Sequence, residues 1–217
     1  MNKTQPHKYI FSLEDISISI KGEIPLKVSL NVKNGDFIII KGKNSSGKSM
    51  LLKLFYLKCL PNKGKIIFEG NELKNSSKDL VQEFRKKIGV ILQNDFLIPF
   101  LNVYQNIEIA CEIQRNTKNI ESRMNEIFNW LSLQNIKNEK IQNLSNSQKQ
   151  KVVIARALIN NPKLILADQP ETFLDSDFRK KLMYLFSSLN KLGSTIIMTT
   201  NDLSQFDESC RIITLDT

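Results

Sequence analysis

One glycine-rich stretch, residues 42–49, constrains the fold of this chain more than any other feature. It reads Gly-Lys-Asn-Ser-Ser-Gly-Lys-Ser and fits the phosphate-binding loop pattern G-x-x-x-x-G-K-[ST] without a substitution. The β-branched and aromatic run 37–40 before it is typical of a buried strand, and residues 50–56 after it are mostly helix formers. A surface turn rich in Gly and Ser is the alternative, but the flanking strand and helix favour a socket for polyphosphate.

The residues of this loop have different expected roles. The glycines let the backbone curl so that its N–H groups point at phosphate, and the helix N-terminus adds further donors and a positive dipole. The lysine supplies a charge for the β- and γ-phosphates, and the last hydroxyl can ligate Mg²⁺. The expected nucleotide-binding residues are Gly42, Lys43, Asn44, Ser45, Ser46, Gly47, Lys48, Ser49 and Met50.

A second, acidic group is needed to hold Mg²⁺, and Asp168 is the candidate. It ends the apolar run 164–167, and an aspartate at the end of a buried strand commonly holds the ion through water. An aspartate that merely caps the following turn is the alternative. The presence of the phosphate loop favours the metal role, so we expect Ser49 and Asp168 to serve the same ion.

The pattern along the chain predicts an α/β fold. Alternation of apolar and polar residues at period two predicts strands in 10–20 and 26–32. Further strands are expected at 65–68, 88–92, 164–167, 195–200 and 211–215, and helices after the loop, at about 79–87, and before Gly193. We expect a single domain over residues 1–217.

Residues 94–151 differ from the rest, because they show helical periodicity and no strand pattern. Met124, Ile127, Phe128 and Leu131 fall on one helix face and are expected to pack in a core. The chain is therefore predicted to have a core of about 9–93 and 152–217 with a helical subdomain inserted at about 94–151.

Composition restricts the classes of function. No apolar run approaches the ~20 residues that span a bilayer, and the N-terminus leads into no signal-peptide region, so we expect a cytoplasmic protein. The three widely spaced cysteines predict free thiols rather than a metal site. The net charge of +9 raises nucleic-acid binding as one function, but no basic stripe interleaved with aromatics is visible, and no direct nucleic-acid contact is expected.

The order of motifs resembles the nucleotide-binding domain of ATP-binding-cassette (ABC) transporters over nearly the whole chain. Gln93 matches the Q-loop glutamine, and residues 144–151 occupy the signature position. Residues 164–170 match the Walker B strand, 173–175 resemble the D-loop, and 199–202 stand where the switch histidine belongs. The resemblance implies an ABC-type P-loop NTPase core with an antiparallel β subdomain and a helical insertion.

The same resemblance implies the ligands and partners. ATP and Mg²⁺ would be the cofactors, with Ser49, Gln93 and, through water, Asp168 around the metal. Two chains would close head to tail as a homodimer, in which the signature residues of one face the ATP of the other. These signature contacts are Ser145, Ser147 and Gln148.

Several positions depart from the family pattern. The catalytic glutamate after the Walker B aspartate is Gln169, and the switch histidine is Asn201. The two signature glycines are Asn146 and Ser147, and Ile20 lies near the position of the adenine-stacking aromatic. An amide cannot accept a proton from water, so these replacements predict that hydrolysis is slow or lost.

The short length, the Ala-Asp-x-Pro sequence and residues 102–107 resemble the subgroup of the bacterial cell-division ATPase FtsE. This likeness implies a peripheral protein on the cytoplasmic face of the inner membrane that works with an FtsX-like integral membrane partner and contacts the membrane only indirectly. A lipoprotein-release or macrolide-export ATPase and a non-hydrolysing ATP-dependent clamp remain alternatives. Phe96, Leu97, Phe100 and Leu101, expected in a helical segment after Gln93, form either a docking surface or ordinary core.

Overall fold

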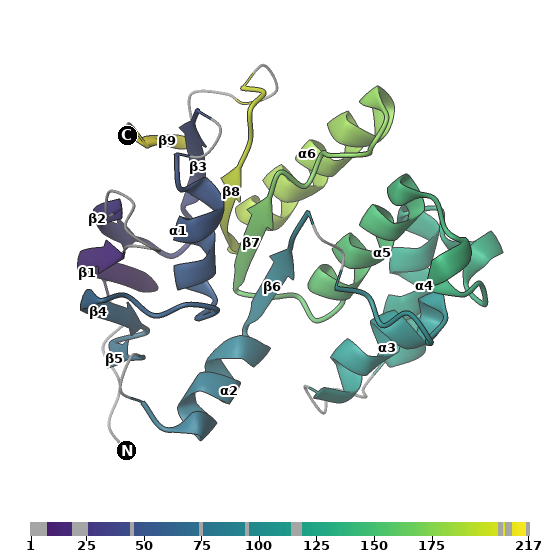
Figure 1. The fold of residues 1–217 in the computed structure, drawn as a ribbon. Coiled ribbons are helices and arrows are strands. Elements are labelled where there is room, and N and C mark those ends of the chain that lie inside the picture. The colour runs from purple at the N-terminus through teal and green to yellow at the C-terminus, as the bar shows by residue number, and fades with distance from the viewer. Residues whose placement is uncertain are drawn as a thin grey trace.

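The computed structural model describes residues 8–18, 26–43, 46–73, 76–93, 96–113, 119–203, 206 and 210–215. Within them the chain forms two sheets and six α-helices (Figure 1). The four-stranded sheet has the order β2-β1-β4-β5 with antiparallel pairs, and the five-stranded parallel sheet has the order β6-β7-β8-β3-β9. The α/β fold class expected from the sequence is confirmed.

The antiparallel sheet contains β1 (Phe11–Ile18), β2 (Leu26–Val32), β4 (Lys63–Phe68) and β5 (Asn71–Glu72). The parallel sheet contains β3 (Phe37–Gly42), β6 (Ile88–Ile91), β7 (Leu164–Asp168), β8 (Thr195–Thr199) and β9 (Arg211–Leu215). The helices are α1 (Lys48–Phe55), α2 (Lys78–Lys86), α3 (Val103–Ile113), α4 (Ile120–Trp130), α5 (Asn146–Leu158) and α6 (Ser176–Lys191), with 3₁₀ turns η1 (Gln134–Ile136) and η2 (Ile141–Asn143).

The parallel sheet is the middle layer, because its central strands bury both faces. In β3, Ile38 and Ile40 join one hydrophobic cluster, with α1 and the antiparallel sheet, while Phe37 and Ile39 join another, with α3, α4, α5 and α6. Strands β7 and β8 divide their side chains in the same way. Continuous apolar runs are required at this position because no face of these strands meets water.

Helix α1 lies between the two sheets, whereas α3, α4 and α5 gather on the far side of the parallel sheet (Figure 1). The stripe of Met124, Ile127, Phe128 and Leu131 packs into the second cluster, as expected. None of the helices in the described part of the chain has the length and apolar character that crossing a bilayer requires.

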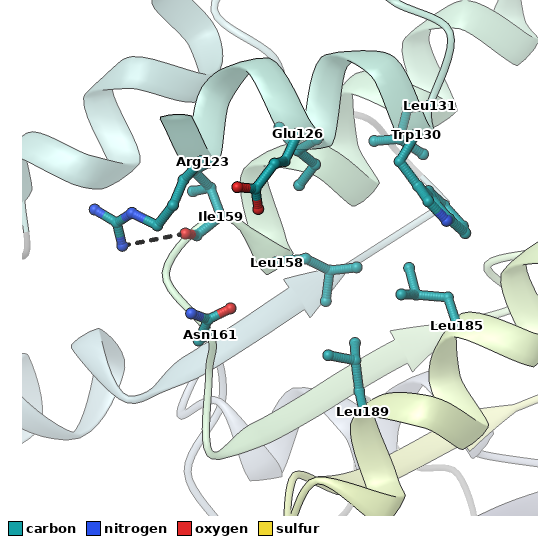
Figure 2. Close-up of a pocket in the computed structure, with 10 residues that line it drawn as sticks. Arg123, Glu126, Trp130, Leu131, Leu158, Ile159, Asn161, Leu185 and Leu189 are labelled. Carbon is teal, nitrogen blue, oxygen red and sulfur yellow. Dashed lines mark hydrogen bonds between the residues drawn. The ribbon is translucent and has the colours of Figure 1, made fainter. Parts of the chain in front are cut away.

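A hollow of about 260 Å³ opens between α4, the end of α5 and α6 (Figure 2). Apolar side chains form most of its wall, among them leucines of α5 and α6 and the ring of Trp130, and Arg123 at its polar end donates to the carbonyl of Ile159 at 3.5 Å. None of the expected nucleotide-binding residues lines it, so it is separate from the phosphate loop.

The segment after Gln93 is where the sequence-based expectation was wrong. The described residues 96–102 form turns rather than a helix, and α3 begins only at Val103. Pro99 disfavours helix at this point, and the buried side chain of Asn106 bonds the backbone of Ile98, Leu101 and Asn102. A side chain thus satisfies the polar groups that helical hydrogen bonds would otherwise satisfy.

Candidate functional site

Strand register brings the chemical groups to one edge of the parallel sheet. Asp168 of β7 lies opposite Thr199 of β8, and Thr199 lies opposite Ile40 of β3. The C-terminal ends of the three strands therefore align, two residues before Gly42 begins the loop. Ligands of parallel α/β sheets bind at this edge because the loops and helix N-termini converge there.

The described part of the phosphate loop has the backbone that its glycines allow. Gly47 has φ +90°, a left-handed conformation that a side chain disfavours, and it stands immediately before α1. At Gly42, an added Cβ would lie 2.4 Å from Ser46 Oγ and 2.8 Å from the carbonyl oxygen of Leu215. Gly42 is therefore required for close packing of the loop against β9.

Lys48 is buried at the start of α1, and its ammonium group caps the loop. Nζ donates to the carbonyl oxygens of Gly42 at 2.6 Å and Lys43 at 2.8 Å. An ammonium group has three N–H donors, so these two bonds hold the charge in place and leave one donor for an anion. Such a buried cation at a helix N-terminus is suited to phosphate.

The loop and strand ends also fit Mg-ATP by their donor chemistry. Ser46 Oγ is buried and has no partner among the described residues, which suits a hydroxyl that faces phosphate. The expected metal-binding groups of Ser49, Gln93 and Asp168 are all oxygen donors, which Mg²⁺ prefers. When bound, the ion would neutralise phosphate charge. Over the described ranges, no group of three or more His, Cys, Asp or Glu residues forms a separate metal cluster.

Asp168 is held by a residue that sequence reasoning missed. Thr199 Oγ1 donates to Asp168 Oδ1 at 2.6 Å and accepts from the backbone N–H of Gln169 at 3.1 Å. One hydroxyl therefore orients both the carboxylate and the next residue. Only the strand pairing reveals this contact, because the two residues are distant in sequence.

Gln169 pairs with the Q-loop residue. The register places Ile91 of β6 opposite Ala167 of β7, so Gln93 and Gln169 follow their strands side by side. Gln93 Nε2 donates to Gln169 Oε1 at 2.5 Å. This bond engages the only side-chain acceptor atom of Gln169 and leaves its NH₂ group, which donates but cannot take a proton from water.

Asn201 and Glu171 lie on neighbouring turns. Asn201 follows β8 and is exposed. Glu171 does not point at the Gln169 amide but accepts from Thr200 Oγ1 at 2.5 Å, and burial raises the pKa of its carboxyl group. The turn that carries Gln169 is therefore tied to the segment that carries Asn201.

The signature residues form the start of α5. Ser145 Oγ accepts from the N–H of Gln148 at 3.2 Å, and Gln148 Oε1 accepts from the N–H of Ser145 at 2.8 Å, which is a capping box. Asn146 and Ser147 are the first two residues of the helix, and neither has positive φ. Glycine is thus not required by the backbone at these two positions.

Buried Gln150, which sequence reasoning also missed, donates from Nε2 to the carbonyl of Pro170 at 3.1 Å. This bond connects the signature helix to the turn after β7. Three positions singled out from the sequence, Ile20, Asn44 and Ser45, lie outside the described residues. Their contributions to the site stay predictions.

The expected docking residues separate into two groups. Leu97 is only 8% exposed and belongs to the core, so the core alternative holds for it. Phe96 and Phe100 are 62% and 77% exposed. Arg156 of α5 donates to the carbonyl of Phe96 at 3.0 Å, which anchors this loop to the signature helix.

Comparison with known proteins gives consistent matches. The family described as ABC transporter matches residues 26–172. The methionine import ATP-binding protein MetN of Clostridium acetobutylicum is 34% identical over 209 residues, which cover 95% of this chain and 65% of that protein. The cell division ATP-binding protein FtsE of Streptococcus pneumoniae is 35% identical over 176 residues, which cover 81% of this chain and 76% of that protein.

A solved structure described as a dimeric post-hydrolysis state of the ATP-binding cassette MJ0796, bound to ADP and Pi, resembles the fold with a TM-score of 0.86. It is 33% identical in sequence, and the match covers 94% of each chain. The likeness therefore includes both sheets and the helices around them.

Proposed function

Because the chain belongs to the ABC transporter family of ATP-binding proteins, we propose that it binds Mg-ATP at the edge of the parallel sheet and closes head to tail with a second copy. The observation that carries this proposal is the loop of Gly42, Gly47 and Lys48, aligned with Asp168 by strand register. Nucleotide bound there would contact the signature residues of the partner copy, which start α5. Dimer closure would then depend on the γ-phosphate.

Hydrolysis of the bound ATP is slow or lost in this proposal. A general base near the attacking water contributes about 10²–10⁴ in rate, and Gln169 has no basic group. Gln93 donates to the amide oxygen of Gln169, which is too weakly basic to take a proton from water, and the NH₂ group can donate to phosphate but not activate water. The chain would therefore act as an ATP-dependent clamp whose reopening follows ATP release.

The test is a single-turnover reaction of purified chain with radiolabelled Mg-ATP. The unaltered chain should retain ATP intact, and Gln169→Glu should cleave it at least about 100-fold faster, because a carboxylate can accept from Gln93 with one oxygen and from water with the other. Gln169→Ala is the matched control and should stay inactive. Equal cleavage by the unaltered chain and Gln169→Glu would show that another group positions the water.

Attachment to the membrane would come through an integral partner that contacts Phe96 and Phe100. Both rings are exposed on the loop that follows Gln93, so a contact there could be transmitted to the Gln93–Gln169 pair. Phe100→Glu should abolish recruitment to membranes that contain the partner and leave ATP affinity unchanged. Tyr184→Glu, on the exposed face of α6, is the control for a surface aromatic elsewhere. Loss of both recruitment and ATP binding would refute docking at Phe100.

For the biological setting we propose an FtsE-like role in bacterial cell division with an FtsX-like partner, at the cytoplasmic face of the inner membrane. The resemblance of residues 102–107 and the match to FtsE support it, while the match to MetN is of similar strength. Cells that lack the chain should fail at septation. Normal division with defective transport would favour the exporter or importer alternative.

A further inference from the structure

Glu171 carries a carboxyl group beside the site that is not among the expected metal ligands and does not face Gln169. Two turns, closed by Thr172 N–H to Gln169 O at 3.0 Å and Leu174 N–H to Glu171 O at 3.2 Å, carry it away from the sheet edge. Its Oε1 accepts from Thr200 Oγ1 at 2.5 Å, across from the end of β8. The contact therefore joins two segments that are distant in sequence.

The same hydroxyl also organises the switch segment. Thr200 Oγ1 accepts from the backbone N–H of Asp202 at 3.0 Å, and this bond joins the two residues that flank Asn201. One chain of hydrogen bonds thus runs from Glu171 through Thr200 to Asp202. Asn201 lies inside the turn that these hydrogen bonds close, so the position of the Asn201 backbone depends on them.

The second oxygen of Glu171 lies in an enclosed place. Oε2 is buried without a hydrogen-bond partner among the residues that the structure describes, next to a cavity of about 10 Å³. That volume holds about one water molecule. Met183 and Phe206 supply apolar wall, and Arg179 and Asp202 are the charged groups that line it among the described residues.

The surroundings of Glu171 raise the pKa of its carboxyl group above the ordinary value. Burial raises the pKa of the carboxyl group, and Asp202 adds to the rise, whereas the hydrogen bond from Thr200 and the charge of Arg179 act against it. Arg179 acts on the carboxyl group through its charge, while its Nε donates to the carbonyl of Leu174 at 2.8 Å. A glutamine side chain has the same shape as Glu171 and would keep an acceptor for Thr200, with a donor in place of Oε2.

We propose that Glu171 is a positioning residue, which fixes the turn of Gln169 to the segment of Asn201 and so sets the preference of the site for ATP over ADP. The inference rests on the proposed function, in which the NH₂ group of Gln169 donates to phosphate, and it places Asn201, at the position of the family's switch histidine, toward the same γ-phosphate. ADP lacks that phosphate, so its binding does not depend on their placement. The ratio of ATP to ADP affinity therefore isolates the positioning role from general loss of structure.

The experiment measures the affinities of fluorescent ATP and ADP analogues, with Mg²⁺, for the full chain and three variants. Glu171→Ala should lower the ATP-to-ADP affinity ratio about tenfold, the effect of one hydrogen bond, and keep ADP affinity within about twofold. Thr200→Val removes the other partner and should give the same result. Glu171→Gln should keep the ratio within about twofold of the unaltered chain.

Thermal melting establishes that each variant is folded. An unchanged ratio in folded Glu171→Ala, or equal losses for ATP and ADP, would overturn the inference. If Glu171→Ala does not fold, the comparison of Thr200→Val with Glu171→Gln decides in the same way. If the unaltered chain binds neither ATP nor ADP, the proposed function is overturned, and this inference with it.

Discussion

Asn106 gives the sharpest prediction of stability, because one fully buried side chain supports the whole segment after Gln93. Its exposure is 0%, its Oδ1 accepts from Ile98 N–H at 2.8 Å, and its Nδ2 faces the carbonyls of Ile98, Leu101 and Asn102 at 3.1, 3.4 and 3.0 Å. Two N–H groups serve these three carbonyls, so the side chain contributes about three effective bonds. At about 1 kcal/mol each, Asn106→Ala should lower the free energy of unfolding by about 3 kcal/mol.

Urea unfolding, followed by the fluorescence of Trp130, measures this loss. Trp130 suits the purpose because it is the single tryptophan and packs against the cluster that contains α3. Gln105→Ala is the control, since the exposed Gln105 side chain makes one cap bond to the Asn102 N–H at 3.0 Å and should cost no more than about 1 kcal/mol. Equal losses for the two variants, or a loss under about 1 kcal/mol for Asn106→Ala, would refute the reasoning.

Two other perturbations test an ion-pair cluster at the N-terminal ends of β6 and β7 and the packing of the phosphate loop. Although partial burial opposes it, hydrogen bonds and charges from Lys87 and Lys163 hold the pKa of the Glu69 carboxyl below its ordinary value. The ion pairs therefore stabilise the fold fully above the ordinary pKa of the carboxyl group, and this stabilisation is lost as pH falls through the lowered pKa. Glu69→Gln should lower the free energy of unfolding by about 0.5–1 kcal/mol at pH 7 and should have no effect at a pH where the carboxyl group is protonated. Urea unfolding at these two pH values measures the difference. Gly42→Ala would place a methyl group 2.4 Å from Ser46 Oγ, and calorimetry should show ATP affinity reduced at least about tenfold; an unchanged affinity would contradict the loop geometry.

Much of the fold was predictable because burial leaves a direct record in sequence. Strands β3, β7 and β8 are apolar on both faces and read as continuous runs, while β2 alternates and β1 alternates in sequence except at the irregularity between Leu13 and Ile16. The loop 96–102 was not predictable, because the contacts of Asn106 replace helical hydrogen bonds. Sequence periodicity indicates which side chains are buried, but it does not indicate which backbone groups a buried amide side chain will hydrogen-bond.

The site divides in the same manner. Lys48 and Asp168 were found from local patterns, a loop sequence and a strand end. Thr199 and the pairing of Gln93 with Gln169 depend on strand register, which joins residues far apart in the chain. The sequence identified Gln169 at the position of the family's catalytic glutamate, and the structure showed that Gln93 donates to its amide oxygen.

The measurement that tests the central claim most directly is calorimetric titration of Mg-ATP into the unaltered chain and Lys48→Ala, with Lys53→Ala as a control. Lys48 Nζ is fixed by two loop carbonyls at the start of α1, whereas Lys53 is exposed in the last turn of the same helix and is not among the expected nucleotide-binding residues. The account predicts one ATP bound per chain, retained by Lys53→Ala and lost, or at least about 100-fold weaker, in Lys48→Ala. Equal binding by Lys48→Ala, or no binding by the unaltered chain, would contradict it.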